Sequence, residues 1–278
     1  MVANLTTQHR PGQPTSEPAD TRPRLARIII YPLKSLDGQP VDKARLIAPG
    51  ALEFDRRWAI TDAAGRFLSG KRTPLVHALR LKFDPQAVAF ELSAGDGPQH
   101  TFLWPRHRFD LEHWLAAHFG EPVHVREHER GGLPDDTDLP GPTLISTASL
   151  VEVASWFGLT LDDTRRRFRA NLEIDGVPAF WEDRLVGEVG QGVRFTIGVV
   201  QLVGCNPCQR CIVPSRDQRT SEAIGGFQRE FARRREATLP AWAPRGRFNH
   251  FYRLAVNTTV PETSWQATLS VGDEVRIE

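Results

Sequence analysis

The sequence predicts a strand-rich α+β protein with barrel-like sheets and a few peripheral helices. Short β-branched or apolar runs recur along most of the chain, and turn clusters rich in Gly, Pro and Asp separate them. Helical patterns are few and do not alternate regularly with the strands, which argues against a doubly wound parallel sheet. The chain has 278 residues, of which 40% are hydrophobic and 25% charged, a composition typical of a folded protein of one large or two modest domains.

The first half of the chain predicts strands that end at turn residues. Leu25–Tyr31 is a β-branched run that stops at Pro32. A helix is expected over Asp110–Phe119, with Asp110 as its N-cap and Gly120 as its stop. Further strands are expected at 44–48, 57–61, 78–83, 87–92 and 101–104.

The second half begins with a linker or long loop over residues 130–142, rich in Gly, Pro and Asp. A helix over Thr147–Phe157 is expected to end at Gly158, and an amphipathic helix is expected over Ser221–Arg235. Strands are expected at 172–174, 194–197, 199–203, 253–256 and 274–277. The predicted organisation is a disordered tail over residues 1–24, one domain over 25–128 and a second over 129–278.

Charge and motif content exclude several function classes. Lys and Arg total 35 against 34 Asp and Glu, a net charge of +1 that does not suit a general nucleic-acid binder. No Gly-x-Gly-x-x-Gly or Gly-Lys-Ser/Thr motif of the usual nucleotide sites is present. No apolar signal follows Met1 and no apolar stretch is long enough to span a membrane, so neither secretion nor membrane association is expected and the predicted location is cytoplasmic.

The three cysteines lie together as Cys205, Cys208 and Cys211, in a Cys-x2-Cys-x2-Cys pattern. An odd number in one short window is not a disulfide framework. An iron–sulfur cluster lacks its fourth cysteine, because that place holds Ser215.

Three other chemistries remain open at this point. A zinc site would need a histidine such as His250 as its fourth ligand, and a redox pair would have Pro207 within its spacer. The last alternative is one thiolate bound to a metal that an organic cofactor carries. The cluster alone does not select among them.

Seven short segments, through their order and spacing, favour one of these chemistries. They are Ile30–Ser35, Asp55–Trp58, Leu144–Leu150, Phe168–Leu172, Trp181–Gly187, Cys208–Cys211 and Val271–Asp273. In these segments the chain resembles the MOSC proteins with an N-terminal MOSC-associated β-barrel, the family that contains the amidoxime-reducing component. The resemblance runs from about Arg27 to the C-terminus. It implies a MOSC-associated β-barrel domain packed on a MOSC β-barrel domain with peripheral helices.

The resemblance also implies a molybdenum cofactor, a molybdopterin whose metal takes one cysteine thiolate as a ligand. That ligand falls on Cys211, and the flanking Arg210 is expected to help keep it deprotonated. Cys208 matches the family's second cysteine, which is not the ligand, and Cys205 is expected to be a small buried residue. The cofactor-binding residues carried over are Lys34, Ser35, Arg56, Ser146, Thr147, Arg169, Asn171, Cys208, Gln209 and Arg210.

Several of these assignments have a structural alternative. Asp55 is expected to orient Arg56 through a salt bridge, and the hydroxyls of Ser146 and Thr147 are either helix caps or phosphate donors. Residues two apart on a strand share a face, so Arg169 and Asn171 are expected to converge on one ligand, although Asn171 equally suits a buried backbone group.

Asp183 is either a proton relay near the metal or a turn residue, and Trp181 is expected to pack in the core. Two departures from the family pattern concern substrate identity: Gln209 beside the ligand, and the loop over residues 213–222.

The function that the resemblance implies is a molybdenum-dependent oxidoreductase that removes oxygen from N-hydroxylated small molecules. No flavin, haem or iron–sulfur motif is visible, so a separate protein is expected to deliver the electrons. Two alternatives remain: a sulfur-carrier or cofactor-delivery module with a persulfide on Cys211 or Cys208, and a zinc-stabilised interaction module.

Overall fold

The computed structural model describes residues 22–278, and within them the chain is a strand-rich α+β protein, as predicted. The largest sheet has the strand order β16-β12-β13-β14-β10-β11-β1-β2. Its strands are β16 (Val275–Ile277), β12 (Val193–Ile197), β13 (Val200–Gln209), β14 (Arg253–Thr259), β10 (Leu144–Ser146), β11 (Leu172–Asp175), β1 (Arg24–Ile30) and β2 (Gln39–Val41). A three-stranded sheet beside it contains β15 (Thr268–Ser270), β3 (Lys43–Ile47) and β4 (Ala51–Leu52). The central strands β10 and β11 are buried at consecutive positions, and the buried apolar side chains of the two sheets form one core.

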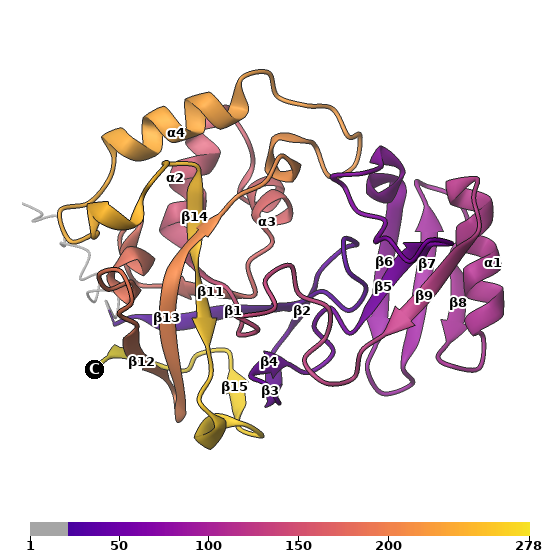
Figure 1. Cartoon of the computed structure of the whole chain (residues 1–278), viewed down its shortest axis with the longest axis horizontal. Helices are drawn as coiled ribbons and strands as arrows, with labels where there is room; N and C mark the ends of the chain where they lie inside the picture. The colour runs from indigo at the N-terminus through magenta and orange to yellow at the C-terminus, as the bar shows by residue number, and fades with distance from the viewer. Residues whose placement is uncertain (1–21) are drawn as a thin grey trace, which may run out of the picture.

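Residues 58–127 form a smaller lobe beside these sheets (Figure 1). It contains a two-stranded sheet of β5 (Trp58–Asp62) and β9 (Val123–Glu127), and a three-stranded sheet of β6 (Leu79–Asp84), β7 (Ala89–Ala94) and β8 (His100–Leu103). Helix α1 (Arg108–Phe119) lies on the outer side of this lobe. The lobe has its own apolar core around the fully buried Trp58.

Three helices accompany the large sheet: α2 (Thr147–Phe157), α3 (Leu161–Phe168) and α4 (Phe227–Ala237). Their aromatic side chains form a third core, in which Trp156, Phe168 and Phe231 are buried. None of the helices within residues 22–278 combines the length and apolar character needed to cross a membrane.

The N-terminal strand is part of the large sheet and not of the smaller lobe. β1 pairs antiparallel with β11, with Leu25 opposite Ile174 and Ile28 opposite Leu172. On its other edge β1 pairs with β2. The chain therefore starts in the large sheet, leaves it to build the smaller lobe, and returns at β10.

Most expected strands are present, and the helix ends at Gly120 and Gly158 are confirmed, since both glycines adopt the left-handed backbone at the helix C-caps. Two helix starts were predicted wrongly. Helix α1 begins at Arg108 after His107, so Asp110 lies within its first turn and is not its N-cap. Helix α4 begins at Phe227 instead of Ser221, because Ala223 forms a β-bridge with Arg216 and Gly226 has a left-handed backbone, with a φ angle of 70°, that cannot continue a right-handed helix.

Helix α3 and five strands had not been predicted: β2, β4, β9, β10 and β15. β13 also continues through two of the cysteines to Gln209, six residues further than expected. Residues 1–21 of the predicted tail lie outside the described residues, and Arg24, assigned to that tail, opens β1.

Candidate functional site

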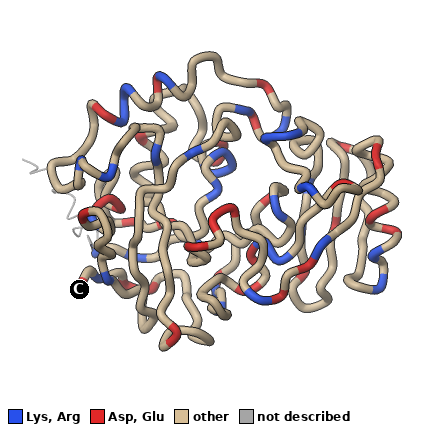
Figure 2. Tube along the Cα trace, in the orientation of Figure 1, with Lys and Arg blue, Asp and Glu red and all other residues tan. Residues whose placement is uncertain are grey.

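A cavity of about 680 Å³ lies between the two parts of the molecule. Most of the predicted site residues line it: Lys34, Ser35, Arg56, Arg169, Asn171, Cys208, Gln209, Arg210 and Cys211. They come from the segments that follow β1 and β4, from the end of α3, and from the end of β13. Figure 2 shows basic positions from both parts of the molecule around this junction.

The cavity wall is predominantly cationic. Its lining includes the basic residues Lys34, Arg56, Lys71, Arg167, Arg169, Arg210 and Arg253, and the acidic residues Asp55, Asp135 and Asp136. Lys34 is engaged within the protein, because its Nζ lies 2.8 Å from a carboxylate oxygen of Asp135 and also donates to the carbonyls of Leu133 and Pro134. The loop predicted as a linker is thereby fixed as one wall of the cavity.

Two arginines stack on the ring of Tyr31. The guanidinium of Arg56 lies 4.9 Å from the ring centroid, and that of Arg169 lies 4.1 Å from it. Arg56 forms the expected salt bridge with Asp55 and also approaches the side-chain oxygen of Asn171 at 3.3 Å. Arg169 has no hydrogen bond or ion pair from its side chain within the described residues, and burial lowers the pKa of this guanidinium. An anion bound in the cavity would supply the missing partner.

Three of the cavity residues have a left-handed backbone that non-glycine residues rarely adopt. The φ angles are 74° at Ser35, 52° at Arg56 and 52° at Arg169. Such conformations are kept where the surrounding structure requires them, and they concentrate at functional sites. Arg169 is the C-cap of α3 and not part of a strand, so the expectation that it shares a strand face with Asn171 is wrong. The two residues reach the cavity through this turn instead.

Asn171 also serves the backbone, as one of the two alternatives proposed. Its side-chain amide donates to the carbonyl of Ile29 at 3.0 Å, and its side-chain oxygen accepts from the backbone N–H of Thr143 at 3.2 Å. It therefore joins β1 to the segment before β10, at the floor of the cavity.

The cysteines have three different environments. Cys208 Sγ accepts a hydrogen bond from Arg210 Nη1 at 3.1 Å, so Arg210 is directed to Cys208 and not to Cys211 as expected. The backbone carbonyl of Cys211 accepts from the hydroxyl of Tyr252 at 3.0 Å. Burial raises the pKa of this hydroxyl, which keeps it protonated as a donor. Cys205 does not line the cavity, and it is half-buried instead of buried as expected, with its sulfur 3.4 Å from the carbonyl of Val203.

Several nitrogens of residues that line the cavity are buried without a hydrogen-bond partner within residues 22–278. They are Nε of Arg167, Arg210 and Arg253, and Nε2 of His77. Unpaired buried donors are rare and costly, and they indicate a group that the protein alone does not supply. Together with the free thiol of Cys211, these donors fit a ligand that is anionic and carries a metal able to bind sulfur.

Three predicted site residues are not brought to the cavity, which corrects their assignment. Ser146 is fully buried as the N-cap of α2, where its hydroxyl accepts from the backbone of Ser149 at 3.1 Å, and Thr147 donates to Glu173. Asp183 is buried in an ion pair with Arg235. Ser146 is thus the helix cap that one alternative proposed, whereas the side chains of Thr147 and Asp183 are held by Glu173 and Arg235. Trp181 packs in the core as expected.

The structure also adds residues that sequence reasoning missed, among them His77, Lys71, Arg253 and Asn257. Nothing in their local sequence distinguishes them, because tertiary contacts bring them to the cavity. Within residues 22–278 no three side chains of His, Cys, Asp or Glu gather as metal ligands, so a closed zinc site is not formed there.

Comparison with known proteins gives two family matches. Residues 22–120 match the model of the MOSC N-terminal beta barrel domain, and residues 143–276 match the model of the MOSC domain. The proteins named molybdenum cofactor sulfurase from Drosophila ananassae and Drosophila melanogaster are each 28% identical over 72% of this chain. This chain spans 29% of the length of those relatives. Among solved structures, the YUAD protein from Bacillus subtilis is 12% identical and covers 92% of this chain and 94% of its own, with a TM-score of 0.40.

Proposed function

This chain belongs to the MOSC-domain proteins that carry an N-terminal MOSC β-barrel domain, and we propose that it binds the molybdenum cofactor in the cavity and acts as an oxidoreductase on N-hydroxylated small molecules. The observation that carries the proposal is one cavity in which a free thiol, Cys211, and several cationic donors without partners lie together. The relatives named molybdenum cofactor sulfurase support a function related to this cofactor.

The residues present suit the parts of such a cofactor. The buried Nε atoms of Arg210 and Arg253 offer charged donors to a phosphate group, and burial makes each hydrogen bond to an anion stronger than it would be in water. Cys211 would hold the metal through its thiolate. When bound, the cofactor supplies the two-electron chemistry of the reduction.

The protein's own part in the reaction is to position the reactants and to hold charge. The left-handed turns at Ser35, Arg56 and Arg169 fix the cavity wall, and the hydroxyl of Tyr252 holds the backbone beside Cys211. Fixed donors of this kind do not have to reorganise during the reaction. Since Asp183 is buried away from the cavity, a proton would reach the substrate from solvent or from a group in the cavity wall. We further propose a cytoplasmic location and a separate electron-donor protein.

The test is metal and pterin analysis of protein purified from a host that makes the cofactor. Cys211→Ala is expected to lose reduction of an N-hydroxylated substrate while the protein remains folded. Cys205→Ala is the matched control, because Cys205 is another cysteine of the same cluster and lies in β13 outside the cavity; this variant is expected to keep wild-type activity and molybdenum content. Wild-type protein without molybdenum or pterin would refute the proposal, as would inactivation by Cys205→Ala alone.

A second candidate function is sulfur transfer through a cysteine persulfide, and the hydrogen bond from Arg210 to Cys208 favours it. Arg210 Nη1 lies 3.1 Å from Cys208 Sγ, and this cationic donor would hydrogen-bond the sulfur atoms of a persulfide on Cys208. Sulfur released by cyanide from metal-free protein, and lost in Cys208→Ser, would support this function. Protein that contains molybdenum but no such sulfur would exclude it.

A further inference from the structure

A smaller cavity of about 70 Å³ lies next to the large one. The two share the lining residues Ser35, His77, Arg169 and Gln218, so they meet at these side chains. Neither His77 nor the smaller cavity has a part in the proposed function. The substrate assignment made for this second cavity rests on the proposed function.

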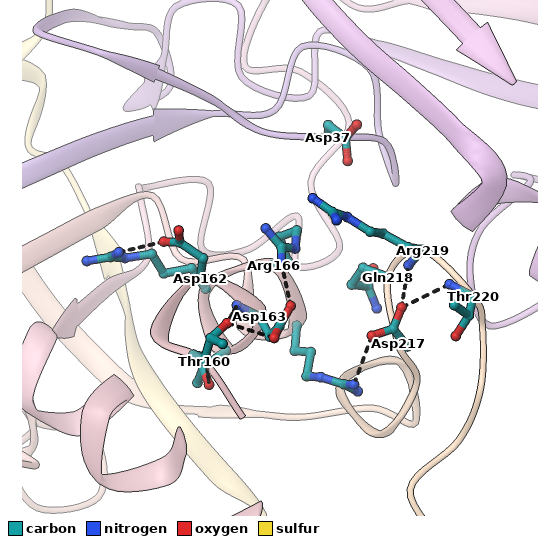
Figure 3. A network of polar contacts seen from close by, with 12 residues as sticks. Asp37, Thr160, Asp162, Asp163, Arg166, Asp217, Gln218, Arg219 and Thr220 are labelled. Carbon is teal, nitrogen blue, oxygen red and sulfur yellow. Dashed lines mark hydrogen bonds and ion pairs between the residues drawn. The ribbon is translucent and has the colours of Figure 1, made fainter. Parts of the chain in front are cut away.

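Most of the cations around the smaller cavity are already neutralised. Arg80 pairs with Asp37 at 2.9 Å, and Arg165 pairs with Glu173 at 2.6 Å. Figure 3 shows the network beside them, in which Arg166 pairs with Asp163 and the neighbouring loop is held around Asp217. Among the described residues of this cavity wall, Arg169 is the arginine without an acidic partner.

His77 is the second group at this junction that lacks a partner. Its side chain is buried, with 3% of the residue exposed, and its Nε2 has no hydrogen-bond partner within residues 22–278. Burial lowers the pKa of the imidazole, and the positive charges of Arg169, Arg216 and Arg80 lower it further. The neutral ring carries one N–H donor, and its cationic surroundings favour an oxygen with negative charge as the acceptor.

The position of the His77 ring is fixed from both sides. A Cβ atom added at Gly70 would lie 2.7 Å from both Cε1 and Nε2 of the ring, so this glycine provides the space that the ring occupies. Arg80 donates to the backbone carbonyls of His77 and Gln218, which joins the smaller lobe to the loop beyond the cysteines. His77 is therefore held at the junction without being used by the protein itself.

We propose that His77 and Arg169 form an oxyanion-binding subsite where the two cavities meet, and that it receives the carboxylate or phosphate group of an anionic substrate. The imidazole N–H and the guanidinium would donate to the same oxyanion. The smaller cavity has room for a group of that size.

The first test is calorimetric titration of the cofactor-free protein with inorganic phosphate. Because a hydrogen bond to a charged group is strong when buried, His77→Ala is expected to weaken phosphate binding by roughly tenfold or more. His77→Gln retains an N–H donor and is expected to bind within about threefold of wild type. His113→Ala on the exposed face of α1 is the matched control and should leave binding unchanged. Equal phosphate affinity in wild type and His77→Ala, or no saturable binding by wild type, would overturn the proposal.

Gly70→Ala provides a variant that leaves His77 in the sequence. Because the added methyl group displaces the ring, this change is expected to weaken phosphate binding as His77→Ala does. Adding Gly70→Ala to His77→Ala should cause no further loss, since the ring is then absent. Wild-type phosphate affinity in a folded Gly70→Ala protein would contradict the assignment.

A final comparison separates the substrate from the cofactor phosphate as the source of the oxyanion. Protein loaded in a cofactor-producing host is assayed with benzamidoxime and with its 4-carboxy derivative, and its pterin content is measured. His77→Ala is expected to keep wild-type pterin content and to raise KM for the carboxylated compound alone, with kcat little changed. Loss of pterin in His77→Ala would assign the subsite to the cofactor and overturn the substrate assignment. If wild-type protein from this host contains no molybdenum, the proposed function is refuted. If phosphate binding is nevertheless weakened by His77→Ala, the oxyanion-binding subsite is still supported.

Discussion

Replacing Glu182 with Gln is expected to change how the stability of this protein depends on pH. Glu182 is buried beside the Asp183–Arg235 ion pair, where Ser149 donates to one of its carboxylate oxygens at 2.9 Å. The other oxygen has no partner within the described residues. Burial, reinforced by the charge of Asp183, raises the pKa of Glu182 from 4.5 to about 7.

The sign follows from where the proton is held. The folded protein keeps the Glu182 proton up to about pH 7, whereas the unfolded chain releases it near its usual pKa of 4.5. Stability is therefore greatest below the unfolded pKa and falls as the pH rises through the folded pKa. Each unit of pKa corresponds to about 1.4 kcal/mol, which makes the full effect about 3 kcal/mol.

The Glu182→Gln protein has no such proton to lose, so its free energy of unfolding should fall less with pH. Urea unfolding followed by tryptophan fluorescence from about pH 5 to about pH 8 gives the difference between wild type and variant. That difference is expected to change by about 2 to 3 kcal/mol in favour of the variant. Glu188→Gln, at an exposed neighbouring position, is the control and should follow wild type. Parallel pH curves for wild type and Glu182→Gln would refute the reasoning.

Two further predictions concern groups described above. Ser146→Ala should lower the free energy of unfolding by about 1 to 2 kcal/mol without changing cofactor content; lost cofactor in a stable variant would restore the phosphate-donor alternative. Asp183→Asn should lower stability by about 3 kcal/mol, because the buried Arg235 loses its counter-charge, and should leave the pH profile of turnover unchanged. A shifted profile in that variant would return Asp183 to the reaction.

Local sequence predicted the elements whose signals are local. The β-branched run at β1 and the glycines that end α1 and α2 act through backbone sterics and burial within a few residues. Helix α3 also had a local signal, because Thr160 caps it by accepting from the backbone of Asp163, a spacing typical of helix starts.

Cavity residues were predicted where a family motif lies at or just after the end of a helix or strand. They were missed where only tertiary contacts bring the residue to the cavity. Arg169 and Cys211 follow α3 and β13 directly, so their motifs reach the cavity wall. Asp183 has a motif of the same apparent quality, yet Arg235 from α4 lies beside it and neutralises it. His77 has no motif at all, and its importance arises from Arg169 and Gly70, neither of which is next to it in sequence.

The pairing of β1 with β11 has a practical consequence for anyone who divides this chain. A fragment that starts at the MOSC match, residue 143, would lack β1 and β2 and expose the backbone edge of β11. Unpaired edges of this kind invite association between copies. A fragment of residues 22–120 would in turn carry β1 and β2 without β11, the other neighbour of β1. The two matched segments are thus interlocked, and co-expressing them as separate pieces should restore a soluble complex more readily than expressing either alone.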